Sequence, residues 1–178
     1  MLYPLHFEQK TDFSTIRNLL KEKCISTLGQ EKVDEIQFSS DFEEINRLLN
    51  QTDEMLRVLT TDGEEMPIGD FFDIRHALSR VRVEGLFLDE KEVSELWRAL
   101  EAVRRLVGFL TKKDDTPYPY LSELIPGTET FPIIIKRIDA ILNKFGKIKD
   151  NASPELARIR KEINQVENST GASVCVLV

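Results

Sequence analysis

The chain has 178 residues, of which 41% are hydrophobic and 31% are charged, and it carries a net charge of −7 at pH 7. This composition excludes a disordered tail or a fibre and is sufficient for one globular domain or two small ones. The negative charge argues against strong non-specific binding of nucleic acid by the whole chain. The first residues lack a signal-peptide pattern, and no window holds the roughly 18 apolar residues of a membrane span. With only Cys24 and Cys175 as cysteines, these features predict a cytoplasmic protein without disulfides or a membrane segment.

Apolar residues at intervals of three and four predict amphipathic helices in the first third of the chain. One helix is expected over 12–24, a shorter one after Ser26, and a third over 40–61. The pair Ser40 and Glu43 has the spacing of a capping box, which predicts the start of the third helix. Phe42 is expected in the core, within an apolar stripe that comprises Phe42, Ile45, Leu48, Leu49, Met55, Leu56 and Leu59.

The middle of the chain alternates between polar connections and helical patterns. A Gly- and Pro-containing surface loop is expected over 63–73, a short helix over 74–81 and a brief extended turn over 81–88. A long helix should begin at Asp89, whose acidic neighbours suit a helix start, and end near residue 112. After a linker, a run of isoleucines predicts a helix over 131–143.

The last predicted helix begins with Ser153 as N-cap and Pro154 at its first position. Its narrow apolar stripe, from Leu156 through Ile159 and Ile163 to Val166, suits a coiled-coil-like arm rather than a helix packed on several sides. The segment 171–178 is apolar and β-branched, and we do not expect it to continue the helix. The sequence thus predicts an all-α, irregular helical bundle with a helical core over 1–150, the base of a long arm helix over 151–170 and an atypical apolar tail over 171–178.

No sequence motif for catalysis or cofactor binding stands out. The Gly146-Lys147 pair is not part of a Walker loop. His6 and His76 lack the spacing of metal ligands and are expected on the surface, while Cys24 falls on an apolar stripe and is expected to be a buried, unreactive thiol. A zinc site built from the two histidines and two cysteines, or a metal enzyme using the pairs Glu43-Glu44 and Glu64-Glu65, remains a remote alternative. We therefore predict no catalytic, cofactor or metal residue in this chain.

Charge and aromatic residues point to two candidate contact regions. The range 31–65 has a charge balance of −8 and the range 136–161 a balance of +5, so the C-terminal third is the better candidate to approach phosphate. Solvated helix faces would explain the same pattern. Tyr118 and Tyr120, beside Lys112 and Lys113, form the aromatic cluster that could contact a partner, whereas Trp97 and most phenylalanines fall on stripes typical of core packing.

Three stretches resemble the second branch of the bacterial MutS family, the MutS-two proteins. The stretch FEQKTDFSTIRNLLKEKCISTLGQEKVDEI, followed by FSSDFEEINRLLNQTDEMLRVL, is similar to the N-terminus of that branch, and IGDFFDIRHALSRV over 68–81 is similar to its usual loop and helix. The resemblance covers about residues 5–168. Its most specific part is similar to the entry of the long helix of this branch and comprises Gly146, Ile148, Asp150, Ala152, Ser153, Glu155, Leu156, Ile159 and Arg160.

The resemblance implies a fold like the core and lever region of these proteins. It implies a non-catalytic N-terminal structural module that links an ATPase to a pair of helical arms that embrace branched DNA or recombination intermediates. The ATP and Mg²⁺ of the family, and its endonuclease module, would belong to other parts of the parent protein. The family's mismatch-reading motif has the form Phe-x-Glu, but Phe42-Glu43-Glu44 is expected to serve helix capping and the core instead.

The resemblance further implies that the full-length parent is a homodimer that acts on DNA, or in some members on collided ribosomes. Weak or absent DNA binding is expected for this chain alone. The alternative function is a stand-alone helical interaction module that pairs through the apolar stripe of the helix beginning at Ser153.

Overall fold

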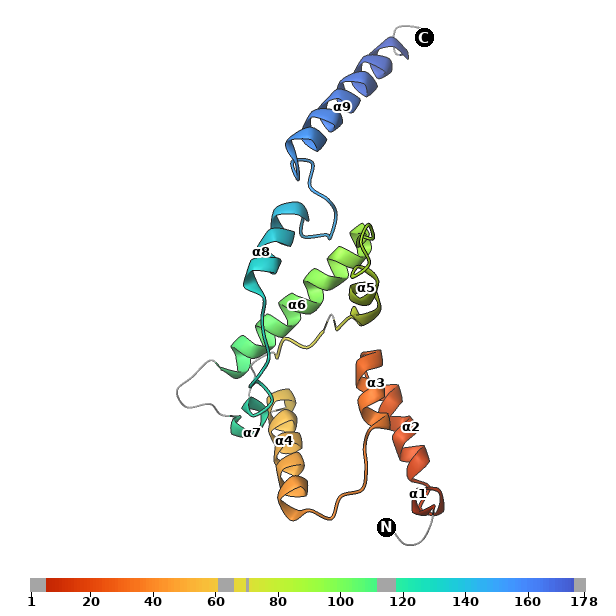
Figure 1. Ribbon diagram of the computed structural model, residues 1–178, viewed down its shortest axis with the longest axis vertical. Helices are drawn as coiled ribbons and strands as arrows, with labels where there is room; N and C mark the ends of the chain where they lie inside the picture. The colour runs from red at the N-terminus through yellow and green to blue at the C-terminus, as the bar shows by residue number, and fades with distance from the viewer. Residues whose placement is uncertain (1–5, 61–65, 70, 112–117, 175–178) are drawn as a thin grey trace.

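The computed structural model describes residues 6–60, 66–69, 71–111 and 118–174, and every regular element in this part of the chain is an α-helix (Figure 1). The one β-type pairing there is an isolated bridge between Leu142 and Ile148. The all-α prediction is therefore confirmed. The helices are α1 (Phe7–Lys10), α2 (Phe13–Lys23), α3 (Thr27–Asp34), α4 (Phe42–Thr60), α5 (Arg75–Arg80), α6 (Glu90–Leu110), α7 (Pro119–Ser122), α8 (Pro132–Ile141) and α9 (Pro154–Val174).

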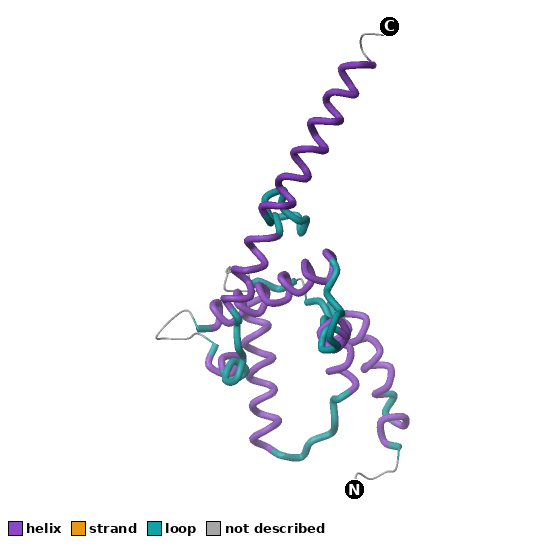
Figure 2. Tube along the Cα trace, turned by 45° about the horizontal axis from the view of Figure 1, so that its top comes forward, coloured by secondary structure: helices purple, strands orange, loops and turns teal. Residues whose placement is uncertain are grey.

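The molecule is open and elongated. In Figure 1, α2 and α3 lie side by side, a connection leads from them to α4, and α9 extends away from the remaining helices at the opposite end from the N-terminus. Figure 2, turned by 45°, shows the same separation of α9 from the other helices. The accessible surface of the chain is 14103 Å², whereas a compact monomer of this mass exposes about 8,800 Å². A large share of its apolar side chains thus remains in contact with solvent.

The main apolar cluster joins the end of α4 to the end of α6 and to α7. Val58, Leu110, Tyr118 and Leu121 are buried there, with Met55, Met66, Leu106, Phe109 and Ile125 packed around them. The rings of Tyr118 and Phe109 are stacked with their centroids 5.9 Å apart. The expectation that Tyr118 could contact a partner is therefore wrong, because this side chain is part of the core.

A buried carboxylate completes this junction. Glu54 is only 3% exposed, and its two oxygens accept hydrogen bonds from the backbone amides of Tyr120 and Leu121, at 3.2 and 2.8 Å. Gln51, one turn earlier on α4, donates to the carbonyl of Tyr120 at 3.2 Å. Amides in the first turn of a helix lack partners within the helix, so the α4 side chains supply the partners that α7 needs.

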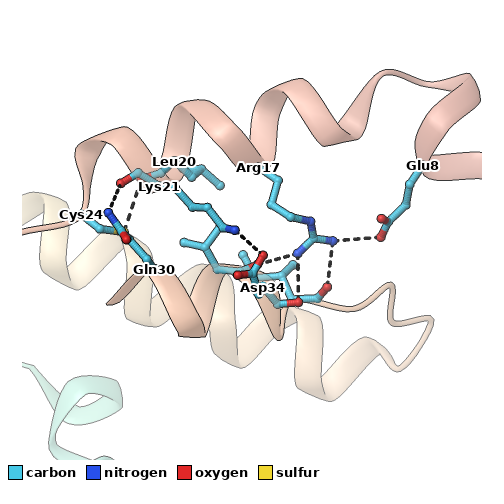
Figure 3. A network of polar contacts seen from close by, with 9 residues as sticks. Glu8, Arg17, Leu20, Lys21, Cys24, Gln30 and Asp34 are labelled. Carbon is cyan, nitrogen blue, oxygen red and sulfur yellow. Dashed lines mark hydrogen bonds and ion pairs between the residues drawn. The ribbon is translucent and has the colours of Figure 1, made fainter. Parts of the chain in front are cut away.

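The N-terminal helices are joined by Arg17 of α2 (Figure 3). Its guanidinium donates to the carbonyls of Val33 and Ile36, at 2.5 and 3.1 Å, and forms an ion pair with Glu8 at 3.0 Å. The carbonyls at the end of α3 have no partner within that helix, so this cation satisfies them and also favours the negative helix end. A second ion pair, between Lys21 and Asp34 at 2.6 Å, holds the same two helices together.

The position of the apolar stripe on α4 differs from the prediction. Phe42, expected in the core, is 79% exposed. Among the seven stripe residues only Met55 contacts the buried cluster, whereas the side of α4 that is buried carries Glu54 and Val58. The reason is that periodicity identifies an apolar face but not the element that covers it, and α7 packs against a different side of this helix.

Three further local expectations need correction. The N-cap of α4 is Asp41, whose Oδ1 accepts from the amides of Glu43 and Glu44 at 2.9 and 3.1 Å, so the capping pair Ser40 and Glu43 was placed one residue too early. The thiol of Cys24 is half-buried rather than buried and donates to the carbonyl of Leu20 at 3.3 Å. Finally, α9 continues to Val174, because 171–174 keep helical backbone where we expected the helix to have ended.

Candidate functional site: the arm helix and its base

The helix α9 is positioned by the segment that precedes it, and we call residues 142–153 the arm base. Within the arm base, the backbone amide of Asn143 donates to the carbonyl of Lys147 at 2.8 Å, and its side-chain oxygen accepts from the amides of Phe145 and Lys147 at 2.8 and 3.1 Å. Gly146 adopts a φ of +75° at the centre of this turn, a conformation in which residues with a Cβ are strained. The turn is thus specified locally by Asn143 and Gly146.

The arm base is anchored to the start of α6. Glu90 accepts a hydrogen bond from the amide of Ile148 at 3.0 Å and pairs with Lys147 at 3.6 Å. Gly146 approaches Ser94 so closely that a Cβ at this position would collide with the serine side chain. Both contacts require α6 to present a carboxylate and a small side chain one turn apart, which its first two turns provide.

The start of α9 agrees with the prediction. The hydroxyl of Ser153 accepts a hydrogen bond from the amide of Leu156 at 3.1 Å, as an N-cap does. Arg160, two turns into the helix, forms an ion pair with Asp150 of the arm base. The Arg158–Glu162 pair, at 2.8 Å, lies within α9 itself. These contacts fix how α9 leaves the arm base, while Ile159, Ile163 and Val166 on its apolar stripe remain exposed.

Most cations of the basic range 136–161 already serve the fold. Lys144 lies over the ring of Phe145 at 5.0 Å, and Lys149 donates to the carbonyl of Asp139 at 2.6 Å. Lys147 and Arg160 form the ion pairs described above, with Glu90 and Asp150. The positive charge predicted for this region is present, but the structure uses much of it to stabilise the arm base.

A depression of about 380 Å³ lies beside the arm base. Phe72, Ser94, Arg98, Phe145 and Lys147 contribute to its walls, and the guanidinium of Arg98 lies 5.8 Å from the centre of the Phe72 ring. The wall combines cations with Glu90, Lys91 and Glu95, so charges of both signs face the space. Such a mixed lining selects no single class of ligand.

The structure places the other predicted candidates apart from one another. His6 is exposed near α1, and His76 is exposed on α5, as expected. Among the described residues, no group of three or more His, Cys, Asp or Glu side chains is arranged to hold a metal ion. Cys175, the Glu64-Glu65 pair, Lys112 and Lys113 lie outside the described residues. Tyr120 is half-buried and its amide is bound by Glu54. In the helices that the structure describes, none is long and apolar enough for a membrane span.

A second polar bridge connects α3 to the start of α5. Arg75 pairs with Asp73 at 2.6 Å and with Glu31 at 2.7 Å. Its hydrogen bonds lower the pKa of Asp73 to about 2 and also lower the pKa of Glu31. The three side chains are exposed, so they indicate a contact between two parts of the chain rather than a catalytic group.

Sequence reasoning did not find the residues that hold these parts together. Glu54, Arg17 and Glu90 all bind backbone groups that lie far along the chain or in another helix. The one available signal was weak: Glu54 lies beside Val58 on a side of α4 that the apolar stripe did not include. The specific motif that did predict a structural feature is Ser153-Pro154, which starts α9.

Together, the open shape, the braced arm base and the projecting α9 define a helical scaffold that presents a long helix. Comparison with known proteins gives a more particular result. No protein-family model matches the chain. The chain is 32% identical over 154 residues, or 86% of its length, to Endonuclease MutS2 of Alkaliphilus oremlandii, and 31% identical over 159 residues to Endonuclease MutS2 of Ruminiclostridium cellulolyticum. A more distant match, to Endonuclease MutS2 of Lactiplantibacillus plantarum, is 26% identical over 160 residues.

The chain is therefore related to the MutS2 family over most of its own length. It spans about a fifth of the length of the curated relatives it matches, with 19% of the Alkaliphilus oremlandii protein and 20% of the Ruminiclostridium cellulolyticum protein covered. The family resemblance stated from the sequence is confirmed at this level.

Proposed function

We propose that this chain is a non-catalytic structural module of a MutS2-type, DNA-binding ATPase that acts on branched DNA or recombination intermediates. In this proposal, the helices before residue 150 form a core and lever, and α9 is the base of an arm that embraces DNA. ATP, Mg²⁺ and any endonuclease activity belong to other parts of such a protein. The supporting observations are the relation to proteins named Endonuclease MutS2 and the projection of α9 from the other helices (Figure 1).

The observation that carries the proposal is the construction of the arm base. Glu90 holds the turn from α6, and Asp150 holds the first turns of α9. A helix that merely ends a chain does not need its direction fixed at both sides of the preceding turn. A helix that transmits movement between two other parts of a protein does, because the lever must not rotate freely about its attachment.

The test has a mechanical readout and a binding readout. Spin labels at Arg105 of α6 and Asn164 of α9 should give a narrow distance distribution, and Arg160→Gln together with Glu90→Gln should broaden it without reducing the helix content. Titration of a labelled four-way DNA junction should show weak binding that decreases further as salt is raised. Tight binding that salt does not weaken, or a broad distance distribution in the unaltered chain, would contradict the proposal.

The second candidate function is a stand-alone interaction module that pairs through the stripe of α9. The exposed side chains of Ile159, Ile163 and Val166 favour it. Removal of residues 153–178 should then abolish a dimer that light scattering detects in the full chain. If the parent instead acts on ribosomes, the same arm base would serve that substrate, and junction DNA would show no preference over a duplex.

A further inference from the structure

The exposed side of α4 has a sequence pattern of its own, independent of α9. Its outward residues recur at alternating intervals of three and four, which is the spacing of a coiled-coil seam rather than of a helix packed in a globular core. Leu49 is 63% exposed and Leu59 is 58% exposed. We call this set the α4 seam, and it comprises Phe42, Ile45, Leu49, Thr52, Leu56 and Leu59.

The seam is separate from the surface that α4 uses inside the molecule. Glu54 and Val58 face α7 and the buried cluster, and neither belongs to the seam. Thr52, the one polar member, donates its hydroxyl hydrogen bond to the carbonyl of Leu48 at 2.8 Å, so it could be covered without losing that bond. The seam thus offers an apolar ridge with no charged side chain along it.

The order of the seam residues is the same from either end. The intervals are three, four, three, four and three, so a second α4 laid antiparallel matches every seam position. Phe42 then faces Leu59 of the other copy, Ile45 faces Leu56, and Leu49 faces Thr52. A sequence that is self-complementary in this manner suits a two-fold contact between identical chains.

The residues beside the seam agree with this pairing. In the antiparallel arrangement Leu48 would lie next to Met55 of the other copy, and Asn46 next to Asp53. Asp53 already forms an ion pair with Arg57 of its own helix, at 3.4 Å. No two like charges meet along the seam, although each α4 belongs to a segment with a net charge of −8 over residues 31–65.

The size of the seam is sufficient for a specific contact. A helix of 19 residues is about 28 Å long, and burying the five apolar seam side chains and Leu48 would remove roughly 600 Å² of apolar surface per copy. Two copies together would cover about 1,200 Å², the lower end of stable protein interfaces. We propose that two copies of this chain pair through antiparallel contact of their α4 seams.

Sedimentation velocity of the full chain over a range of concentrations tests the pairing. A reversible monomer–dimer equilibrium is expected, and Leu49→Glu should weaken it at least about tenfold, because it places an unpaired charge in the apolar contact. The matched control is Ile163→Glu, which alters an exposed isoleucine, 50% accessible, on α9 and should leave the equilibrium unchanged. A chain that stays monomeric, or equal losses in both variants, would overturn the proposal.

A charge-pair rescue separates pairing from a general effect on folding. In the double variant Leu49→Glu, Thr52→Lys each new carboxylate would face a lysine of the other copy, so dimerisation should recover relative to Leu49→Glu alone. Since two acidic segments approach each other, the unaltered dimer should tighten as salt rises. An interface with a basic partner, or with DNA, would weaken under the same change. Failure of the rescue, or dissociation at higher salt, would contradict the α4 contact.

Cross-linking tests the direction of the helices. With Cys24 and Cys175 replaced by serine, a mixture of Phe42→Cys and Leu59→Cys chains should form a disulfide between the two variants under mild oxidation. Phe42→Cys alone should not link to itself. A Phe42-to-Phe42 link would show a parallel arrangement and exclude the proposed antiparallel pairing, whereas a dimer lost only on removal of residues 153–178 would assign the contact to α9.

Discussion

The junction of α4 with α7 and the arm base of α9 hold their helices in different ways. At the α4–α7 junction, a buried carboxylate satisfies amides that lie 66 and 67 residues away and is surrounded by apolar side chains. At the arm base, the contacts are ion pairs and turn hydrogen bonds with largely exposed partners. The difference indicates that the first contact determines stability and the second determines direction, since exposed ion pairs contribute little free energy but still restrict geometry.

The largest expected effect is at the α4–α7 junction. Glu54→Ala should lower the free energy of unfolding by about 3 kcal/mol, because two buried amides lose a charged acceptor. Glu54→Gln should cost less, since it keeps one carbonyl oxygen. Urea denaturation followed by circular dichroism measures both, and Glu43→Ala, on the exposed side of the same helix, is the control. Equal stability of Glu54→Ala and the control would mean that the junction is not the stabilising centre.

The Arg17 contact is intermediate between the two regions, since it is polar but largely buried. Arg17→Gln should lower the free energy of unfolding by about 2 kcal/mol, because the carbonyls at the end of α3 lose their charged donor. Hydrogen exchange of the α3 amides should become faster in this variant, while the amides of α4 keep their protection. Arg47→Gln, an exposed arginine on α4, should change neither quantity.

Loss of the pair at the arm base should have a smaller effect on stability and a larger one on geometry. Arg160→Gln is expected to change the free energy of unfolding by less than about 1 kcal/mol, because Asp150 and Arg160 are exposed. The spin-label distance between α6 and α9 should nevertheless broaden. A large loss of stability without broadening would remove the distinction between the two regions.

The bridge formed by Arg75 is exposed but connects distant segments, and it is expected to have the smallest effect. A folded-state pKa of about 2 for Asp73, below its ordinary value of 3.8, means that its contribution is complete above about pH 4 and is lost as the pH falls towards 2. Carboxyl carbon shifts measured by NMR should show this titration. In Arg75→Gln the midpoint should return towards 3.8, and an unchanged midpoint would exclude Arg75 as its cause.

Local sequence determined the helices but not how they pack. The start of α9 followed from Ser153 and Pro154, and the beginning of α6 from the acidic cap at Asp89, because capping depends on residues within one turn. The helix over 74–81 was also predicted from local apolar spacing. The exact cap of α4 was not, since Ser40 and Asp41 are both good N-cap residues and only the backbone distinguishes them.

The sequence by itself determined that this chain is helical, that it resembles MutS2 proteins and that α4 carries an amphipathic stripe. Only the tertiary structure decided that the α4 stripe faces solvent, that Tyr118 is buried and that Glu54 binds α7. The physical reason is that helix formation and capping depend on neighbours within a few residues, whereas burial depends on which distant segment supplies the opposing surface.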